Sequence, residues 1–222
     1  QQQQQQRNLA ASPGSCAAPP CLTVRLVRLA TRASIGAKRN AAVRLARGDV
    51  VMHWDDDDIH HADRVVVQAG PVLRGEAAMT TLQRTWLAQV DVEGGAVAWF
   101  EHRKLKKTTQ RSQMSTLTYS RAIALATPFT DTSLGEDTEF AERVVGGCNA
   151  HAVLTLPCAY VRHGSNSWDA AHGSNALEQL FDKTAAASGP PAGLGVDADI
   201  EAELLRAAED ILAHGACDKV HD

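Results

Sequence analysis

The sequence predicts an α/β fold, with a mostly parallel sheet flanked by helices. Stretches with the period of a strand alternate along the chain with stretches of helical period, as they do in parallel α/β proteins. Four consecutive aspartates, Asp55–Asp58, follow an apolar strand, and ligands of such sheets bind beyond the carboxyl ends of strands. The chain has 222 residues, 44% hydrophobic and 22% charged, which is enough for one domain with a core.

The first part of the domain is expected to open with a strand and a helix. Apolar and polar side chains alternate over Leu22–Leu26, which is the period of a strand. Ser34 is of a residue type that caps helices, and a stretch of helical period follows it over Ala37–Arg47. Gly48 comes directly after that stretch, so the helix is expected to end there.

A second strand and a second helix are expected next. The strand covers Asp49–Trp54, and it leads into the aspartate run. A short helix is expected over Asp63–Ala69, because the pair Gly70-Pro71 breaks helices. The four aspartates therefore lie in the loop between this strand and this helix.

The part of the domain after Met79 is expected to contain one helix and several short strands, some of which pair antiparallel and so interrupt the parallel pattern. Short strands lie between Met79 and Phe100, with a turn at Glu93–Gly95. A further strand is expected over Thr116–Leu125. A helix over Glu136–Val145 is expected to end at two glycines, and the uncharged run Val144–Val161 indicates a buried strand after a turn.

The ends of the chain differ in composition from the middle. Residues 1–21 open with six glutamines and continue with Ala, Ser, Pro and Gly, so a disordered tail is expected. The domain is expected over residues 22–183, followed by a linker rich in Ala, Gly and Pro over 184–196. Residues 197–215 have an apolar face of helical period, which predicts an appended amphipathic helix.

Charge and cysteine content exclude some classes of function. The net charge of −4 gives no positive field for a nucleic acid or an anionic membrane, so neither is expected as a partner. The five cysteines form no C-x-x-C pair, which excludes a zinc ribbon and a redox dithiol. No membrane span and no signal peptide are expected. The compartment stays open, with the cytoplasm and the Golgi lumen both compatible with the sequence.

The aspartate run is the first candidate site. Four adjacent carboxylates repel one another, and a divalent cation would remove that repulsion. Oxygen ligands on a short loop suit Mg²⁺ or Mn²⁺ held together with the phosphate oxygens of a substrate. The alternative is a solvated acidic turn that caps the next helix. The position of the run at the end of an apolar strand favours the metal site.

Two further segments contain residues that suit catalysis or metal binding. Glu136 and Asp137 open a helix, where a carboxylate could act as a general base, although the helix dipole alone favours acidic residues there. His163 stands at the end of a strand and is either a ligand to metal or phosphate or an ordinary hydrogen-bonded histidine. The helix start at Ser34–Asn40 has a glycine and two cations and is either a modest anion site or a plain surface turn.

In this order along the chain, the motifs resemble those of family 2 glycosyltransferases of the GT-A fold. The resemblance covers about Val24–Trp168, and it rests on five segments: Ser34–Asn40, Gly48–Asp58, Asp63-Arg64, Pro128-Phe129 with Gly135–Phe140, and Tyr160–Trp168. It implies a GT-A-like sheet and transfer of a sugar from a nucleotide sugar to a hydroxyl group of a glycan, a protein or a small molecule.

The resemblance also implies roles around a metal ion. The aspartate run is similar to the acidic metal-binding motif of the family, so Asp57 is expected to bind Mn²⁺ or Mg²⁺, with Asp58 as the other carboxylate ligand. Asp55 is expected on the ribose or pyrophosphate of the donor, and Asp56 is also expected to bind the donor. His163 resembles a late histidine that helps to hold the metal or the diphosphate.

The remaining implied roles concern catalysis. Asp137 resembles the base that takes the proton of the acceptor hydroxyl in an inverting displacement. Glu136 beside it is expected near the donor. Arg39 occupies the place of a basic residue that can touch the nucleotide base.

The family pattern is incomplete at its start. The strand, loop and second strand that cradle the nucleotide base in the family have no counterpart before Leu22, so a fold truncated at its N-terminus is expected. Two other classes of function stay open. One is a non-catalytic remnant that binds nucleotide or carbohydrate. The other is a different metal-dependent phosphate enzyme, such as a nucleotidyltransferase or a phosphohydrolase.

Overall fold

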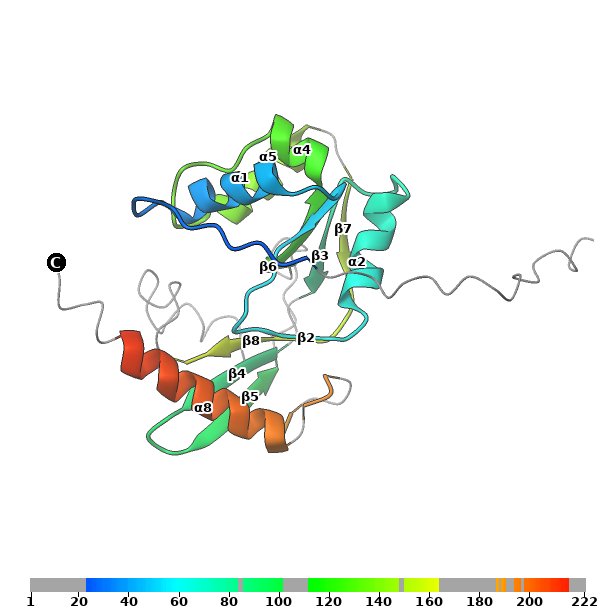
Figure 1. Ribbon diagram of the computed structural model, residues 1–222. Helices are drawn as coiled ribbons and strands as arrows, with labels where there is room; N and C mark the ends of the chain where they lie inside the picture. Colours follow the sequence, from blue (N-terminus) through cyan, green and yellow to red (C-terminus); the bar gives the residue numbers. More distant parts are fainter. Residues whose placement is uncertain are drawn as a thin grey trace, which may run out of the picture. The chain divides into compact units, whose positions relative to one another are not determined.

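The structure is a computed structural model that describes residues 23–83, 86–101, 112–147, 150–163, 187, 189–190, 194–196 and 198–215 (Figure 1). The chain divides into two compact units, residues 1–32 and residues 33–222. The tail predicted to be disordered lies outside the described residues, as do the segment Gly164–Trp168 and most of the predicted linker.

All of the helices and strands described belong to the second unit. The helices are α1 (Ile35–Leu45), α2 (Arg64–Leu73), α4 (Arg121–Ala126), α5 (Glu136–Gly146) and α8 (Ala198–Gly215). The strands are β1 (Val50–Met52), β2 (Ile59–His60), β3 (Met79–Gln83), β4 (Trp86–Asp91), β5 (Ala96–Glu101), β6 (Ser112–Ser120), β7 (His151–Leu154) and β8 (Cys158–Arg162). The strand predicted before the aspartate run and the helix predicted after it are therefore confirmed, although β1 covers only Val50–Met52 of the expected Asp49–Trp54.

The strands form two mixed sheets. One has the order β1-β6-β3-β7 and the other the order β2-β8-β4-β5. Among the described residues only β3 with β7 and β4 with β8 pair in parallel, and the other neighbours are antiparallel. The predicted α/β class is confirmed, but the mostly parallel sheet is wrong. The antiparallel excursion is confirmed by β4 and β5, which the turn at Glu93–Gly95 joins directly. Beyond it, β6 also runs antiparallel to both of its neighbours, β1 and β3, whereas parallel neighbours need a long crossover in the same sense.

The strand predicted over Leu22–Leu26 is wrong as well. Residues 23–32 contain no helix or strand, and the side chains of Val24 and Leu26 are each 83% exposed. Alternation of apolar and polar residues is only half of what a strand needs, because its backbone groups also require a hydrogen-bonded neighbour. No strand among the described residues pairs with this segment.

Two predicted boundaries moved, each for a physical reason. Helix α2 continues through Gly70 and Pro71 to Leu73, because proline removes one hydrogen bond while the buried face of the helix holds it against the sheet. The strand predicted over Thr116–Leu125 ends at Ser120, and α4 follows. The sequence of α4 is rich in alanine, the strongest helix former.

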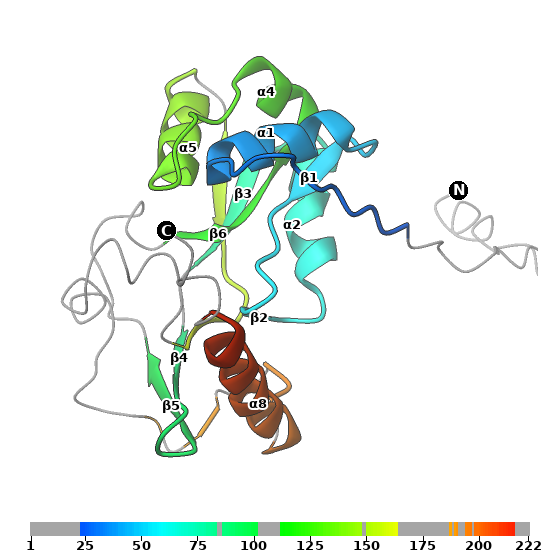
Figure 2. The same ribbon diagram turned by 60° about the vertical axis from the view of Figure 1, so that its left-hand side comes forward.

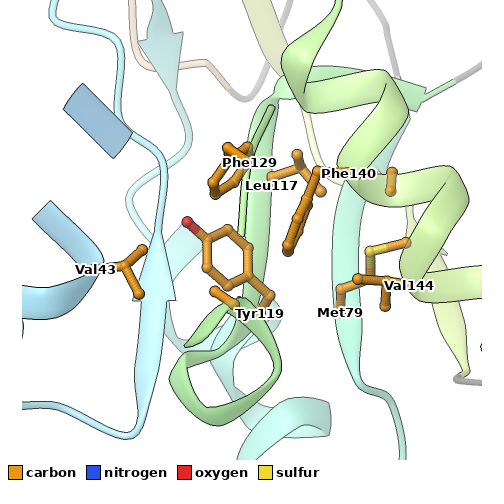
Figure 3. Close-up of a cluster of buried hydrophobic side chains, with 9 residues drawn as sticks. Val43, Met79, Leu117, Tyr119, Phe129, Phe140 and Val144 are labelled. Carbon is orange, nitrogen blue, oxygen red and sulfur yellow. The ribbon is translucent and has the colours of Figure 1, made fainter. Parts of the chain in front are cut away.

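One hydrophobic core lies between the first sheet and the helices α1, α4 and α5 (Figure 3). Its residues are Val43, Met79, Leu117, Tyr119, Ala124, Phe129, Phe140, Ala141 and Val144. The rings of Phe129 and Phe140 stack with their centroids 4.2 Å apart. This core places the start of α5 close to the end of β1, which is the edge that carries the aspartate run.

The opposite face of the first sheet carries α2. Successive side chains of a strand point to opposite faces, so Thr80 and Thr116 face away from the core that contains Met79 and Leu117. The Thr80 hydroxyl donates to the Gln68 carbonyl over 3.0 Å, and the Gln68 side-chain amide donates to the Thr116 carbonyl over 2.8 Å. Helix α2 is therefore attached to this sheet by buried hydrogen bonds.

A second core lies between α8 and the second sheet (Figure 2). Ala208 and the partly buried Leu204 and Leu205 pack against apolar residues of β4, β5 and β8. The indole nitrogen of Trp99 donates to Glu201 over 2.7 Å. Helix α8 thus forms part of the core of the second unit, whereas the sequence predicted an appendage. Within the described part of the chain, no helix has the length and apolar character needed to cross a membrane.

Candidate functional site

The four aspartates lie in the loop between β1 and β2, and their surroundings differ. Asp58 is drawn inward, where its carboxylate accepts hydrogen bonds from the Ser115 hydroxyl at 2.9 Å and from the Val161 amide at 3.2 Å. Burial raises the pKa of Asp58 to about 7, against the effect of those two bonds. Asp56, by contrast, is exposed. Asp58 therefore ties the loop to both sheets, through β6 and β8.

Asp57 meets His163. The Nε2 atom of His163 lies 3.2 Å from Oδ2 of Asp57, and these residues are 106 positions apart in the chain. His163 stands just past the end of β8 and is 7% exposed, while the side chain of Asp57 is 31% exposed. The structure therefore brings together a carboxylate and an imidazole that the sequence predicted as metal ligands, with the carboxylate partly open to solvent.

Asp55 is electrostatically coupled to Asp57 and Asp137. Burial raises the pKa of Asp55 most, the charge of Asp57 raises it further, and the charge of Asp137 acts in the same direction. Arg39 and Arg64 oppose this shift. The negative charge at the start of α5 therefore acts on the aspartate loop in the same direction as the neighbouring aspartate.

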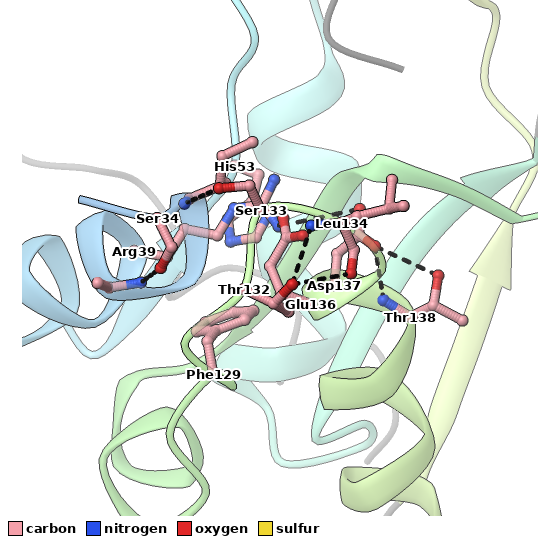
Figure 4. A network of polar contacts seen from close by, with 12 residues as sticks. Ser34, Arg39, His53, Phe129, Thr132, Ser133, Leu134, Glu136, Asp137 and Thr138 are labelled. Atoms are coloured by element: carbon pink, nitrogen blue, oxygen red, sulfur yellow. Dashed lines mark hydrogen bonds and ion pairs between the residues drawn. The ribbon is translucent and has the colours of Figure 1, made fainter. Parts of the chain in front are cut away.

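Arg39 of α1 joins the two acidic residues that open α5 (Figure 4). Its Nη1 atom lies 2.5 Å from the Glu136 carboxylate and 3.8 Å from Oδ2 of Asp137. Glu136 is 4% exposed, and burial raises its pKa while Arg39 opposes that shift. The other oxygen of Asp137 accepts hydrogen bonds from the backbone and the hydroxyl of Thr138, at 2.6 and 3.2 Å. Asp137 is thus held in one orientation from both sides.

The start of α1 is covered by the chain itself. The first amides of the helix donate to the Ser133 hydroxyl, the Thr132 carbonyl and the Ser34 hydroxyl (Figure 4). The Ser34 hydroxyl in turn donates to Asp131, and a Cβ at Gly36 would collide with the Thr130 carbonyl. The anion site considered at Ser34–Asn40 is therefore wrong, because the loop that leads to α5 already takes these donors. The cap at Ser34 is confirmed.

Sequence reasoning placed Asp63-Arg64 among the family motifs but gave no role to Arg64, which is a buried cation beneath the aspartate loop. Arg64, the first residue of α2, is fully buried. Its Nη2 atom donates to the His53 carbonyl over 2.5 Å, its Nε atom donates to Gln68 over 2.9 Å, and its guanidinium lies 4.5 Å from the centroid of the Trp54 ring. A signal was present, since Arg64, Gln68 and Val72 are spaced by four residues on the buried face of α2.

His53, to which the family resemblance gives no role, borders the site. Its Nε2 atom lies 2.9 Å from the Tyr119 hydroxyl inside the core. Burial lowers the pKa of His53 well below 6.5, and the nearby cations Arg39 and Arg64 add to this shift. The residue is therefore neutral in the folded protein at neutral pH.

We expect a pH dependence of stability from His53. Below pH 6.5 the unfolded chain binds a proton at this residue and the folded chain does not, so the stability is lost as the pH falls. Between pH 7 and pH 5.5 this contribution is about 1 kcal/mol. Urea unfolding of wild type and His53→Gln at the two pH values measures it, with a smaller loss expected in the variant. Equal losses would show that His53 is protonated within the fold.

The residues present fit a divalent ion that a substrate helps to hold. Within the described ranges, no group of three or more His, Cys, Asp and Glu side chains could hold a metal by itself. Mg²⁺ and related ions are commonly bound by one or two carboxylates together with substrate phosphates. Asp57 and His163 supply one oxygen and one nitrogen donor, and the carboxylate is a ligand that suits both Mg²⁺ and Mn²⁺.

One family profile matches about half of the chain. The profile of Glycosyl transferase family 2 matches residues 18–126, which include Arg39, the aspartate loop and Arg64, and the match ends before Asp137 and His163. A search of curated proteins found no match. The chain therefore contains a glycosyl transferase family 2 domain at residues 18–126.

Proposed function

We propose that this protein transfers a sugar from a nucleotide-sugar donor to a hydroxyl acceptor, with inversion at the anomeric carbon and with a divalent metal. Family membership implies the donor, the acceptor and the GT-A fold. The observation that supports the finer proposal is the convergence of acidic groups. Asp57 meets His163 at 3.2 Å, and the charges of Asp57 and Asp137 both act on Asp55.

Asp137 is the proposed base. Its Oδ1 atom is held by Thr138, and its Oδ2 atom lies 3.8 Å from Arg39, so the carboxylate keeps one orientation. The proton of the acceptor hydroxyl passes to Asp137 while the acceptor oxygen bonds to the anomeric carbon. The bond from that carbon to the diphosphate oxygen breaks, and its electron pair leaves with the diphosphate. A single displacement of this kind inverts the anomeric centre.

Asp57 and His163 would hold the metal ion, which would neutralise the negative charge that develops on the departing diphosphate. We assign Asp58 to fixing the loop, because both of its oxygens already accept hydrogen bonds from β6 and β8. Asp55 and the exposed Asp56 remain the residues proposed to accept hydrogen bonds from hydroxyl groups of the nucleotide sugar.

Arg39 and Glu136 are proposed at the mouth of the donor site. Their ion pair spans 2.5 Å, and it places a positive charge beside the acidic region. If Arg39 also contacts the nucleotide base, its guanidinium must donate hydrogen bonds to the base while it stays paired with the carboxylates of Glu136 and Asp137. Its five N–H donors make that possible in chemical terms.

We expect a nucleoside diphosphate to stabilise the protein only in the presence of Mn²⁺ or Mg²⁺. A ligand at 100 times its Kd adds about 2.7 kcal/mol to the stability, and that shifts the Tm of a chain of this size by roughly 5–10 °C. Thermal unfolding with uridine, guanosine and cytidine diphosphates, each with Mn²⁺ or with a chelator, measures this effect. The nucleoside without phosphate is the control and should produce no shift.

The same samples separate the proposal from the alternatives. Transfer or hydrolysis of the sugar from a panel of nucleotide sugars supports the proposal. Release of inorganic phosphate from simple nucleotides would instead indicate a phosphohydrolase. A metal-dependent shift in Tm without any turnover of nucleotide sugars would indicate a binding protein that has lost the reaction.

A further inference from the structure

We propose that Arg64 is a positioning residue that fixes the backbone from which the aspartate loop begins, and thereby sets the affinity for the donor. This inference rests on the proposed function of the loop. Arg64 is not expected to touch the donor, because its side chain is fully buried. It would act through His53 and Trp54, the two residues that directly precede Asp55.

The contacts of Arg64 converge on those two residues. Its Nη2 atom donates to the His53 carbonyl over 2.5 Å, and its guanidinium stacks on the Trp54 ring at 4.5 Å. The indole also meets the His60 ring at 4.8 Å on the other side of the loop. Trp54 is nevertheless 54% exposed, so the guanidinium is a main support of this ring on the protein side.

The other end of the guanidinium is anchored in the sheet. Its Nε atom donates to the Gln68 side chain over 2.9 Å, and Gln68 donates to the Thr116 carbonyl of β6 over 2.8 Å. Arg64 thus connects the loop to β6, an inner strand of the first sheet, through α2. Ser115, the neighbour of Thr116, holds Asp58, so β6 supports the loop at both of its ends.

The charge of Arg64 has no ion-pair partner within the described residues, and its Nη1 atom has no hydrogen-bond partner there. Burying such a cation is unfavourable unless nearby negative charge compensates. Burial lowers the pKa of Arg64 to about 10, while Cys158, Asp58 and Asp55 oppose that shift. The guanidinium is therefore charged at neutral pH, and aspartates of the loop are part of what compensates it.

A purely structural role would predict lost stability and nothing more. A positioning role predicts that the loop moves and that donor binding weakens even where the variant is folded. Arg64→Lys separates the two, because lysine keeps the charge but lacks the planar fork that reaches His53 and Gln68 together. Val72→Ala is the matched control. It removes two methyl groups from the buried face of the same helix, away from the loop.

The experiment uses the full chain, well below the Tm of each variant. Fluorine NMR of protein labelled with 5-fluorotryptophan reports the environment of Trp54 without any ligand, with its resonance assigned by Trp54→Phe. Calorimetry with uridine diphosphate and Mn²⁺ reports the affinity. We expect Arg64→Lys to shift the Trp54 resonance and to raise the Kd by about tenfold or more, whereas Val72→Ala changes neither.

Gln68→Met keeps the test decisive if Arg64→Lys does not fold. This variant removes the acceptor of the Nε atom and leaves the bond to His53 in place, so a smaller change in the same two readouts is expected. Variants of Arg64 and Gln68 that match Val72→Ala in both readouts would overturn the inference. The proposed function is judged separately, by sugar transfer in the wild type. If the wild type transfers no sugar, the positioning role is still supported when the Trp54 resonance shifts in Arg64→Lys and not in Val72→Ala.

Discussion

Asp137→Asn is expected to lower kcat for sugar transfer by a factor of about 10² to 10⁴, the range that general-base catalysis contributes. Asparagine has nearly the same shape as aspartate, and it can still accept the hydrogen bonds from Thr138. It cannot take the proton of the acceptor. Binding of the nucleoside diphosphate with Mn²⁺ should change by less than about threefold, because the lost group acts on the acceptor.

The matched control is Glu139→Gln on the same helix. Glu139 is exposed and pairs with Arg143 at 3.8 Å, so its loss should leave kcat within about twofold. Initial rates of transfer at saturating donor compare the two variants with the wild type. If Asp137→Asn transfers sugar as fast as the wild type, Asp137 is not the base, and its position beside Arg39 is explained by the helix dipole alone.

Asp57→Ala is expected to abolish the part of nucleoside diphosphate binding that depends on Mn²⁺. His163 would then be the only protein ligand proposed here, and a single imidazole holds such ions weakly. At the diphosphate concentration that stabilises the wild type by about 2.7 kcal/mol, the variant should show no metal-dependent shift in Tm. Thermal unfolding with and without a chelator measures this difference.

Asp63→Asn provides the control for charge. Asp63 is also close to the loop in sequence, but its side chain is 72% exposed and its ion pair is with His61. This variant should keep the full metal-dependent shift. An unchanged shift in Asp57→Ala would mean that the metal is not held at Asp57, and the aspartate run would then be the solvated acidic turn considered from the sequence.

The sequence was a good guide wherever local chemistry decides structure. Ser34 caps α1, and the paired glycines mark the end of α5. The apolar strand before the aspartates is β1. The family resemblance was readable because its motifs combine residue type with order along the chain. Each of these features depends on residues within a few positions of one another, so neighbouring side chains and backbone groups contain the information.

Local sequence patterns gave wrong predictions where an element depends on contacts with residues far away in the chain. Residues 22–26 alternate like a strand, but alternation does not provide the neighbouring strand that would complete their hydrogen bonds. Pro71 remains helical because the packing of α2 on the sheet outweighs one missing bond. The direction of strand pairing depends on which strands meet, and that is a property of the whole chain.

By itself the sequence determined that an acidic loop follows a buried strand, that two carboxylates open a later helix and that a histidine ends a late strand. Only the tertiary structure decided how adjacent aspartates divide their tasks. Asp58 turns inward to Ser115 and Val161, and Asp57 meets His163. Four identical residues cannot differ through their own chemistry. Distant backbone amides, hydroxyls and cations distinguish them, and folding alone brings those groups within hydrogen-bonding distance.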